Sequence, residues 1–148
     1  MKRKVITALL AATMVASLAV GCGNKGGDSK SDSSKSSSSD EITIGFSQVG
    51  AESDWRTANS ESMKSTFSEK NGYKLIFDDA QQKQENQITA IRNFIQQDVD
   101  YIVLAPVTET GWDTVLKEAK DADIPVIIVD RMIDVSDDSL YTAWVGSN

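Results

Sequence analysis

The sequence predicts an α/β fold in which a parallel β-sheet is sandwiched between helices. Two observations support this over residues 41–148. Short β-prone runs alternate with amphipathic helical patterns, and the third and fourth runs are continuously apolar. Unbroken apolar strands are typical of parallel sheets that are covered on both faces. The repeated strand–helix–strand order then favours right-handed crossovers between neighbouring strands.

Five strands are expected from runs rich in β-branched and aromatic residues. They are predicted at residues 42–46, 73–77, 101–105, 124–129 and 140–145. The third run is closed by Pro106, which cannot donate a backbone hydrogen bond to a neighbouring strand.

Three helices are expected between these strands, at residues 55–70, 84–97 and 111–122. Apolar residues recur in each at helical spacing, which predicts one buried stripe per helix. The stripes are Trp55, Ala58, Met63 and Phe67 in the first, Ile88, Ile91, Phe94 and Ile95 in the second, and Trp112, Val115, Leu116 and Ala119 in the third. The first helix is expected to stop at Asn71-Gly72, because glycine readily takes the left-handed cap conformation.

Residues 1–21 have the layout of an export signal. A basic start at residues 2–4 is followed by an uncharged stretch, Val5 to Val20, that is short for a membrane-spanning helix. Small residues then precede Cys22, a pattern that resembles the lipobox of bacterial lipoproteins, although Ala19 stands where that pattern prefers leucine. We therefore predict a lipoprotein signal peptide at 1–21 and a lipid anchor on Cys22. The alternative is an ordinary signal peptide followed by a stray cysteine.

Residues 22–40 are predicted to be a flexible tether. Eight of the eighteen residues from Gly23 to Asp40 are serine, and none is aromatic or aliphatic. Such a segment has nothing to bury against the entropy lost on ordering. The predicted organisation is a signal at 1–21, a lipid-anchored tether at 22–40 and a folded part at 41–148, which places the folded part at the outer face of the cell membrane.

The composition excludes several classes of function. The chain has no histidine and one cysteine, so Ser-His-Asp triads, Cys-His dyads and histidine-ligated metal sites are absent. A net charge of −7, which becomes −10 without residues 1–21, opposes binding to nucleic acid. No phosphate-cradling glycine run and no calcium loop of the D-x-D-x-D-G type is present. The composition therefore disfavours an enzyme, a cofactor site and a metal site.

The candidate functional residues follow the first and fourth strands. Because the carboxyl ends of parallel strands form one edge of the sheet, where ligands bind in open α/β folds, these residues are expected to converge. They are Glu52, Ser53, Asp54, Trp55 and Arg56 after the first strand, and Asp130 and Arg131 after the fourth.

A flat apolar ring beside carboxylates and guanidinium groups suits a neutral sugar. The ring covers the C–H side of the ligand, and the charged groups form strong hydrogen bonds with its hydroxyls. Two alternatives stay open: Trp55 covers the core, and Asp130-Arg131 is a solvated turn. The polar residues Asp78-Asp79 and Gln81–Gln87 are interpreted as helix-start and surface polarity, and Trp112 and Trp144 as packing residues.

Several motifs carry a resemblance that extends over nearly all of residues 42–146. They lie at 46–50, 52–56, 81–87, 105–107, 111–112, 116–122, 124–126 and 130–131. With these motifs the sequence resembles the galactofuranose-binding proteins of sugar ABC transporters and, more broadly, the ribose/galactose class of type I periplasmic binding proteins.

The resemblance implies a monomeric, two-lobed clamp that traps a monosaccharide and delivers it to a membrane permease with a cytoplasmic ATPase. It carries sugar contacts over to Glu52, Ser53, Trp55, Arg56, Asp130 and Arg131. Asp54 stands where close family members carry glycine.

Family members are about twice as long as the folded part, so residues 41–148 are expected to be the first lobe only and to bind sugar weakly or not at all when alone. The alternatives are a receptor for ribose, galactose or arabinose, the effector lobe of a repressor of the lactose-operon type, and an α/β enzyme.

Overall fold

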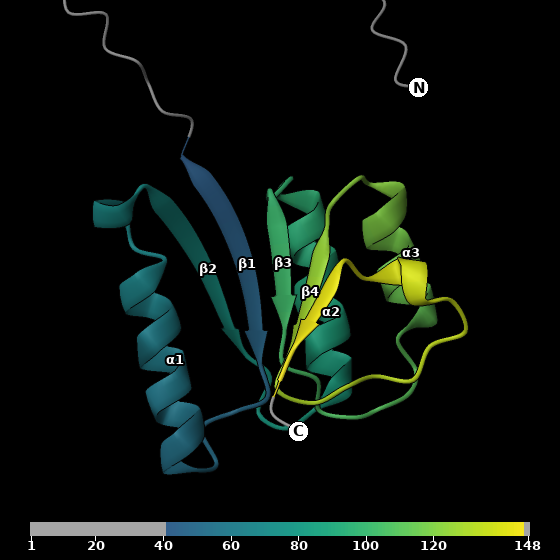
Figure 1. Ribbon diagram of the computed structural model, residues 1–148, viewed down its shortest axis with the longest axis horizontal. Helices are drawn as coiled ribbons and strands as arrows, with labels where there is room; N and C mark the ends of the chain where they lie inside the picture. The colour runs from purple at the N-terminus through teal and green to yellow at the C-terminus, as the bar shows by residue number, and fades with distance from the viewer. Residues whose placement is uncertain (1–40, 147–148) are drawn as a thin grey trace, which may run out of the picture. The chain divides into compact units, whose positions relative to one another are not determined.

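The computed structural model describes residues 41–146, which form a five-stranded parallel sheet (Figure 1). The strands are β1 (Ile42–Gln48), β2 (Tyr73–Asp79), β3 (Tyr101–Leu104), β4 (Val126–Val129) and β5 (Ala143–Val145), in the spatial order β2-β1-β3-β4-β5. Every pairing is parallel. The predicted fold class is confirmed. The predicted signal peptide, the lipidated Cys22 and the tether lie outside the described residues.

The helices are α1 (Asp54–Thr66), α2 (Gln84–Gln96) and α3 (Asp113–Asp121), with short 3-10 turns η1 (Glu69–Asn71) and η2 (Asp138–Leu140). Two helix boundaries predicted from sequence are wrong. The first helix ends at Thr66 rather than residue 70, and the chain then reaches β2 through η1 and the left-handed Gly72 (φ 84°). The third begins at Asp113 rather than residue 111, because Gly111 is itself left-handed (φ 91°) in the preceding loop.

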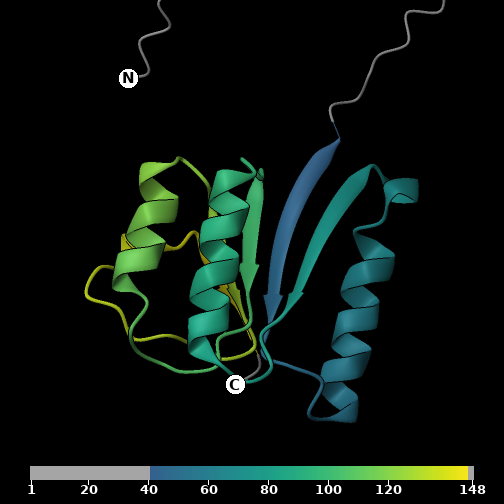
Figure 2. The same cartoon turned by 180° about the vertical axis from the view of Figure 1, so that it is seen from behind.

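Helices α2 and α3 cover one face of the sheet, as Figure 2 shows from behind. The main core lies there, and its fully buried members include Ile91, Leu104, Leu116 and Ile128. Helix α2 approaches β1 closely at Gly45. A β-carbon built at this glycine would lie closer than 3.0 Å to three atoms of the Phe94 ring. Glycine at this position of β1 therefore lets α2 pack tightly on the sheet.

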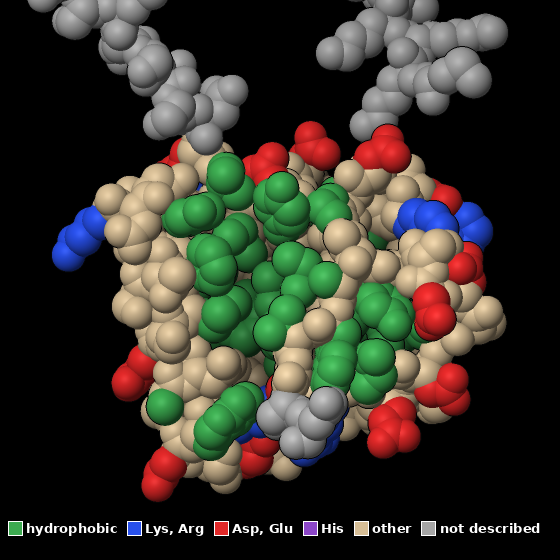
Figure 3. Space-filling model, in the orientation of Figure 1, with side chains coloured by type: hydrophobic (Ala, Val, Ile, Leu, Met, Phe, Trp, Pro, Cys, Tyr) green, Lys and Arg blue, Asp and Glu red, His purple; other side chains and the backbone are tan. Residues whose placement is uncertain are grey.

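The opposite face is covered only in part within residues 41–146. Met63 of α1 and Phe67, the residue that follows this helix, pack against a cluster that includes Ile44 and Phe46. Ile42 and Tyr101 remain 37% and 41% exposed. Figure 3 shows hydrophobic side chains gathered on this face, over the middle of the sheet. They border an open hollow of about 270 Å³.

The expectation that the third and fourth strands are covered on both faces is therefore wrong for β4. Its residues alternate between buried and half-buried, with Val126 and Ile128 turned toward the main core. The reason is that, on the face opposite α2 and α3, no helix of the described residues covers Ile127 and Val129.

The stripe predicted for α1 is also wrong at its amino end. Trp55 is 55% exposed and Ala58 is exposed, whereas the buried residue of this helix is Arg56. The first turn of α1 therefore does not cover the core. The alternative that Trp55 is a core residue is excluded. No helix in the stretch from residue 41 to 146 is long and apolar enough to cross a membrane.

Candidate ligand-binding site

The strand order reverses between β1 and β3. From β1 the chain moves outward to β2, and then returns to the other side of β1 to form β3. At such a switch point the loops that follow neighbouring strands diverge and leave a crevice at the carboxyl edge. The sequence-predicted residues of 52–56 and 130–131 follow β1 and β4 at this edge.

Ser53 fixes the start of α1. Its side-chain oxygen accepts a hydrogen bond from the backbone N–H of Arg56 (3.2 Å), which makes Ser53 the N-cap of the helix. Asp54 is exposed in the first turn, where a negative charge interacts favourably with the helix dipole. The structure thus gives both residues roles in starting the helix that carries Trp55 and Arg56.

Arg56 lies at the centre of the site. Its side chain is 6% exposed, and its Nη2 donates to Asp130 Oδ2 (2.7 Å) while its Nε donates to Glu52 Oε1 (3.1 Å). Its Nη1 lies 3.5 Å from Gln48 Oε1, and its Cζ lies 5.0 Å from the centre of the Trp55 ring. Each of the three guanidinium nitrogens therefore has an acceptor from this chain, and the contact at Nη1 is the longest of the three.

Asp130 follows β4 in a left-handed backbone conformation (φ 68°), which aspartate tolerates better than most residues. Its backbone N–H donates to Val145 O (2.9 Å), which ties it to β5. The same Oδ2 that accepts from Arg56 lies 3.9 Å from Arg131 Nε, and Arg131 Nη1 donates to Val107 O (3.4 Å). The alternative of a solvated turn is therefore excluded for Asp130, whereas Arg131 remains half exposed.

The solvent-facing part of the site has a mixed character. Trp55 and the Arg131 side chain are about half exposed, while the side chains of Glu52 and Asp130 are 28% and 26% exposed. An open hollow of about 480 Å³ adjoins Asp130, and it is lined by Glu109, Asp130, Arg131, Met132, Ile133, Asp134 and Trp144. Asp130 and Arg131 line this hollow, while Trp55 and Glu52 face solvent outside its lining. Together they offer an apolar ring, two carboxylates and a guanidinium, a set suited to an uncharged polar ligand.

Two buried glutamines were missed by the sequence analysis. Gln48 and Gln87 are both fully buried, so the interpretation of Gln87 as surface polarity is wrong. Gln87 donates to Ala105 O (2.7 Å) and accepts from the backbone N–H of Val107 (2.8 Å), and so holds the loop that follows β3. Gln48 is the last residue of β1, and a polar residue at the end of an apolar strand is the only signal that the sequence offers.

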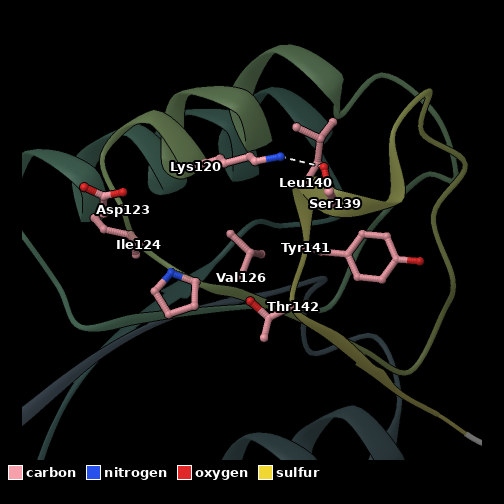
Figure 4. Close-up of a pocket in the computed structure, with 9 residues that line it drawn as sticks. Lys120, Asp123, Ile124, Val126, Ser139, Leu140, Tyr141 and Thr142 are labelled. Carbon is pink, nitrogen blue, oxygen red and sulfur yellow. Dashed lines mark hydrogen bonds between the residues drawn. The ribbon is translucent and has the colours of Figure 1, made fainter. Parts of the chain in front are cut away.

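A separate cavity of about 250 Å³ lies at the opposite edge of the sheet (Figure 4). It is bordered by Val126 at the amino end of β4 and by Tyr141, and Lys120 donates to Ser139 beside it. Val126 is four residues before Asp130, which corresponds to roughly 13 Å along a strand. This cavity is therefore not continuous with the candidate site.

Asp78 lies near the carboxyl end of β2, next to the site. Partial burial raises the pKa of its carboxyl above the ordinary 3.8, and the neighbouring charge of Asp79 acts in the same direction. The hydrogen bond that Ser47 donates to it (3.3 Å) opposes that rise without cancelling it. In residues 41–146 no group of three or more histidine, cysteine, aspartate or glutamate side chains is placed to hold a metal ion.

Comparison with known proteins assigns the family. Residues 44–148 match the family model of the periplasmic binding protein domain. The chain belongs to this family. It is 59% identical over 104 residues to the galactofuranose-binding protein YtfQ of Escherichia coli (strain K12), an alignment that covers 70% of this chain and 32% of the relative.

Solved structures agree with this assignment. The crystal structure of a galactofuranose-binding protein matches with a TM-score of 0.69 at 57% identity, over 72% of this chain and 36% of the other. The periplasmic component of the arabinose ABC transporter from Shewanella sp. ANA-3, bound to L-arabinofuranose, matches with a TM-score of 0.67 at 61% identity, over 70% and 34%. The chain spans about a third of the length of these relatives. The predicted family resemblance is confirmed.

The raised pKa of Asp78 predicts a pH-dependent effect on stability. Because folding favours the protonated carboxyl, ionised Asp78 costs stability above its raised pKa, and this cost disappears as the pH falls toward 3.8. We expect Asp78→Asn to be more stable than the wild type in urea unfolding at pH 7, with the gain shrinking as the pH falls to 4. Asp138→Asn, a change at an exposed aspartate in η2, is the control. An Asp78→Asn gain that is constant over this range would contradict the assignment.

Proposed function

We propose that this chain is the sugar-capturing lobe of an extracytoplasmic solute-binding protein of an ABC transporter, and that its ligand is a monosaccharide in the furanose form, galactofuranose first. The observation that carries the proposal is the exposed Trp55 ring beside the carboxylates of Glu52 and Asp130 at the switch point of the sheet. The relatives support it, since those at 56–61% identity are named or solved with galactofuranose, fucofuranose or arabinofuranose.

The proposed contacts divide the work between an apolar and a polar side. The Trp55 ring lies against the C–H face of the sugar, where dispersion and dehydration favour contact. The carboxylate oxygens of Glu52 and Asp130 that Arg56 leaves free accept hydrogen bonds from sugar hydroxyls, and Arg131 donates to a sugar oxygen. Ser53 and Asp54 border this surface from the start of α1.

We propose a receptor rather than an enzyme. Glu52 and Asp130 share one buried guanidinium, so they serve as fixed hydrogen-bond acceptors. A binding protein of this kind needs no cofactor, because it captures and releases its ligand unchanged. The remaining contacts to the sugar are proposed to come from a second lobe, and a permease with a cytoplasmic ATPase is the proposed partner of the monomeric receptor.

We also propose that residues 1–40 attach the receptor to the outer face of the cell membrane. A diacylglycerol joined to the Cys22 sulfur as a thioether supplies two acyl chains, and acylation of the amine freed by cleavage before Cys22 adds a third. Two or three chains anchor firmly where one chain binds only marginally. The serine-rich residues 23–40 then act as the tether between the membrane and the folded lobe.

The binding proposal is tested by calorimetry on the intact receptor, which contains this lobe and the proposed second lobe. The sugars are galactofuranose, arabinofuranose and galactopyranose. We expect the two furanoses to bind, and Trp55→Ala to weaken the binding at least tenfold, which corresponds to about 1.4 kcal/mol. Trp55→Phe should retain most of the affinity because it keeps an aromatic face.

Tyr101→Ala is the matched control for this test. It removes another exposed aromatic side chain, which lies at the amino end of β3, on the opposite edge of the sheet. Its affinity should stay within twofold of the wild type. A receptor that binds galactopyranose but neither furanose, or a Trp55→Ala variant with unchanged affinity, would overturn the proposed ligand contacts.

The anchor is tested in bacteria that express the chain. Radiolabelled palmitate should label the wild type, and globomycin, which blocks lipoprotein signal peptidase, should cause the uncleaved form to accumulate. Cys22→Ala should lose the label and leave the membrane fraction. If Cys22→Ala stayed fully membrane-bound, Cys22 would not be the anchor.

A further inference from the structure

Gln48 is a buried polar side chain directly beneath the site. It ends β1 and is fully buried, so each unpaired polar atom of its amide would cost free energy. Its Oε1 accepts from the backbone N–H of Val49 (2.9 Å) and faces Arg56 Nη1 at 3.5 Å. Its Nε2 donates to Asn59 Oδ1 (2.8 Å) and to Ser60 Oγ (3.3 Å). The amide therefore connects the end of β1 to the first two turns of α1.

The position of Gln48 complements the two carboxylates around Arg56. Glu52 and Asp130 occupy the Nε and Nη2 sides of the guanidinium, and Gln48 supplies a neutral acceptor on the Nη1 side. Ser60 closes the network, because its hydroxyl donates to Arg56 O (2.9 Å) while it accepts from Gln48. The Arg56 side chain is thus contacted from the interior by Gln48 as well as by the two partly exposed carboxylates.

We infer that Gln48 is a positioning residue for sugar binding, which acts by holding Arg56 in the orientation that places the Asp130 carboxylate at the ligand. The inference rests on the proposed function and goes beyond it, because Gln48 has no exposed surface with which to touch a ligand. Without its oxygen the Nη1 edge of a nearly buried cation loses an acceptor, and the guanidinium can tilt away from Asp130.

Two substitutions of similar size distinguish positioning from packing. Gln48→Met keeps the volume but removes the acceptor, whereas Gln48→Glu keeps an acceptor for Arg56 and can accept from a turned Asn59 amide. If Gln48 only fills space, the uncharged methionine is the milder change. If Gln48 positions Arg56, calorimetry on the intact receptor should show a tenfold or greater loss of furanose affinity for Gln48→Met and a smaller loss for Gln48→Glu.

A double-mutant cycle gives a readout that packing alone would not move. Because Gln48 acts through Arg56 on Asp130, the affinity loss of Gln48→Met should shrink to less than threefold in an Asp130→Asn background. Val99→Ala is the matched control: it opens a buried position before the amino end of β3, so it lowers the melting temperature without changing the affinity.

Three outcomes would overturn the inference: Gln48→Met binds within twofold of the wild type, Gln48→Glu binds more weakly than Gln48→Met, or the losses of Gln48→Met and Asp130→Asn are additive. If Gln48→Met does not fold, Gln48→Glu alone and combined with Asp130→Asn gives the same test of additivity. If the wild type binds no furanose, the proposed function fails. The contact between Gln48 and Arg56 is then tested by melting temperature. Coupled effects of Gln48→Met and Arg56→Lys support the positioning of Arg56 by Gln48, and additive effects overturn it.

Discussion

The described lobe depends on one buried cation. The guanidinium of Arg56 lies between the carboxylates of Glu52 and Asp130, and its bond to Asp130 joins residues 74 positions apart in the sequence. Removing one partner of a buried ion pair costs about 3–5 kcal/mol, because the other charge is left uncompensated in a poorly solvating interior. Arg56 therefore fixes the end of β1 and the start of α1 relative to the turn after β4.

The rest of the site follows from this constraint. Ser53 caps α1 through the backbone N–H of Arg56, so the helix starts at a fixed point. Trp55, the preceding residue, is then placed with its ring over the guanidinium and its other surface toward solvent. Asp130 adopts a left-handed backbone conformation, and its carboxylate bonds to Arg56. The charged groups at this edge bond to each other, which favours a preorganised surface for the proposed sugar.

The sequence was sufficient to predict the fold class and to place the candidate residues after the first and fourth strands, at the carboxyl edge of the sheet. Strand and helix periodicities are local signals, and the rule that ligands bind at the carboxyl edge needs only the strand order. The contact partners could not be predicted, because they depend on three-dimensional packing. A tryptophan at helical spacing suggested a core stripe, whereas the buried residue of α1 is Arg56, since its charge is satisfied by Asp130 from a distant loop.

Two further failures have the same origin. Gln87 lies in a run of polar residues, and only its contacts with Ala105 and Val107 explain why it is fully buried. The apolar run of β4 predicted cover on both faces. Ile127 and Val129 are only half-buried, because no helix of the described residues covers them on that face. In both cases burial depends on residues that are distant in the sequence, and a local pattern does not reveal them.

In this structure the Arg56 guanidinium is held by the protein rather than by solvent. The most direct test is NMR of the Arg56 Nε–H in nitrogen-15-labelled protein without ligand, with the half-exposed Arg131 as an internal reference. We expect the Arg56 proton to exchange with water much more slowly than the Arg131 proton, and Asp130→Asn to accelerate this exchange. An Arg56 proton that exchanges as fast as that of Arg131 would contradict it.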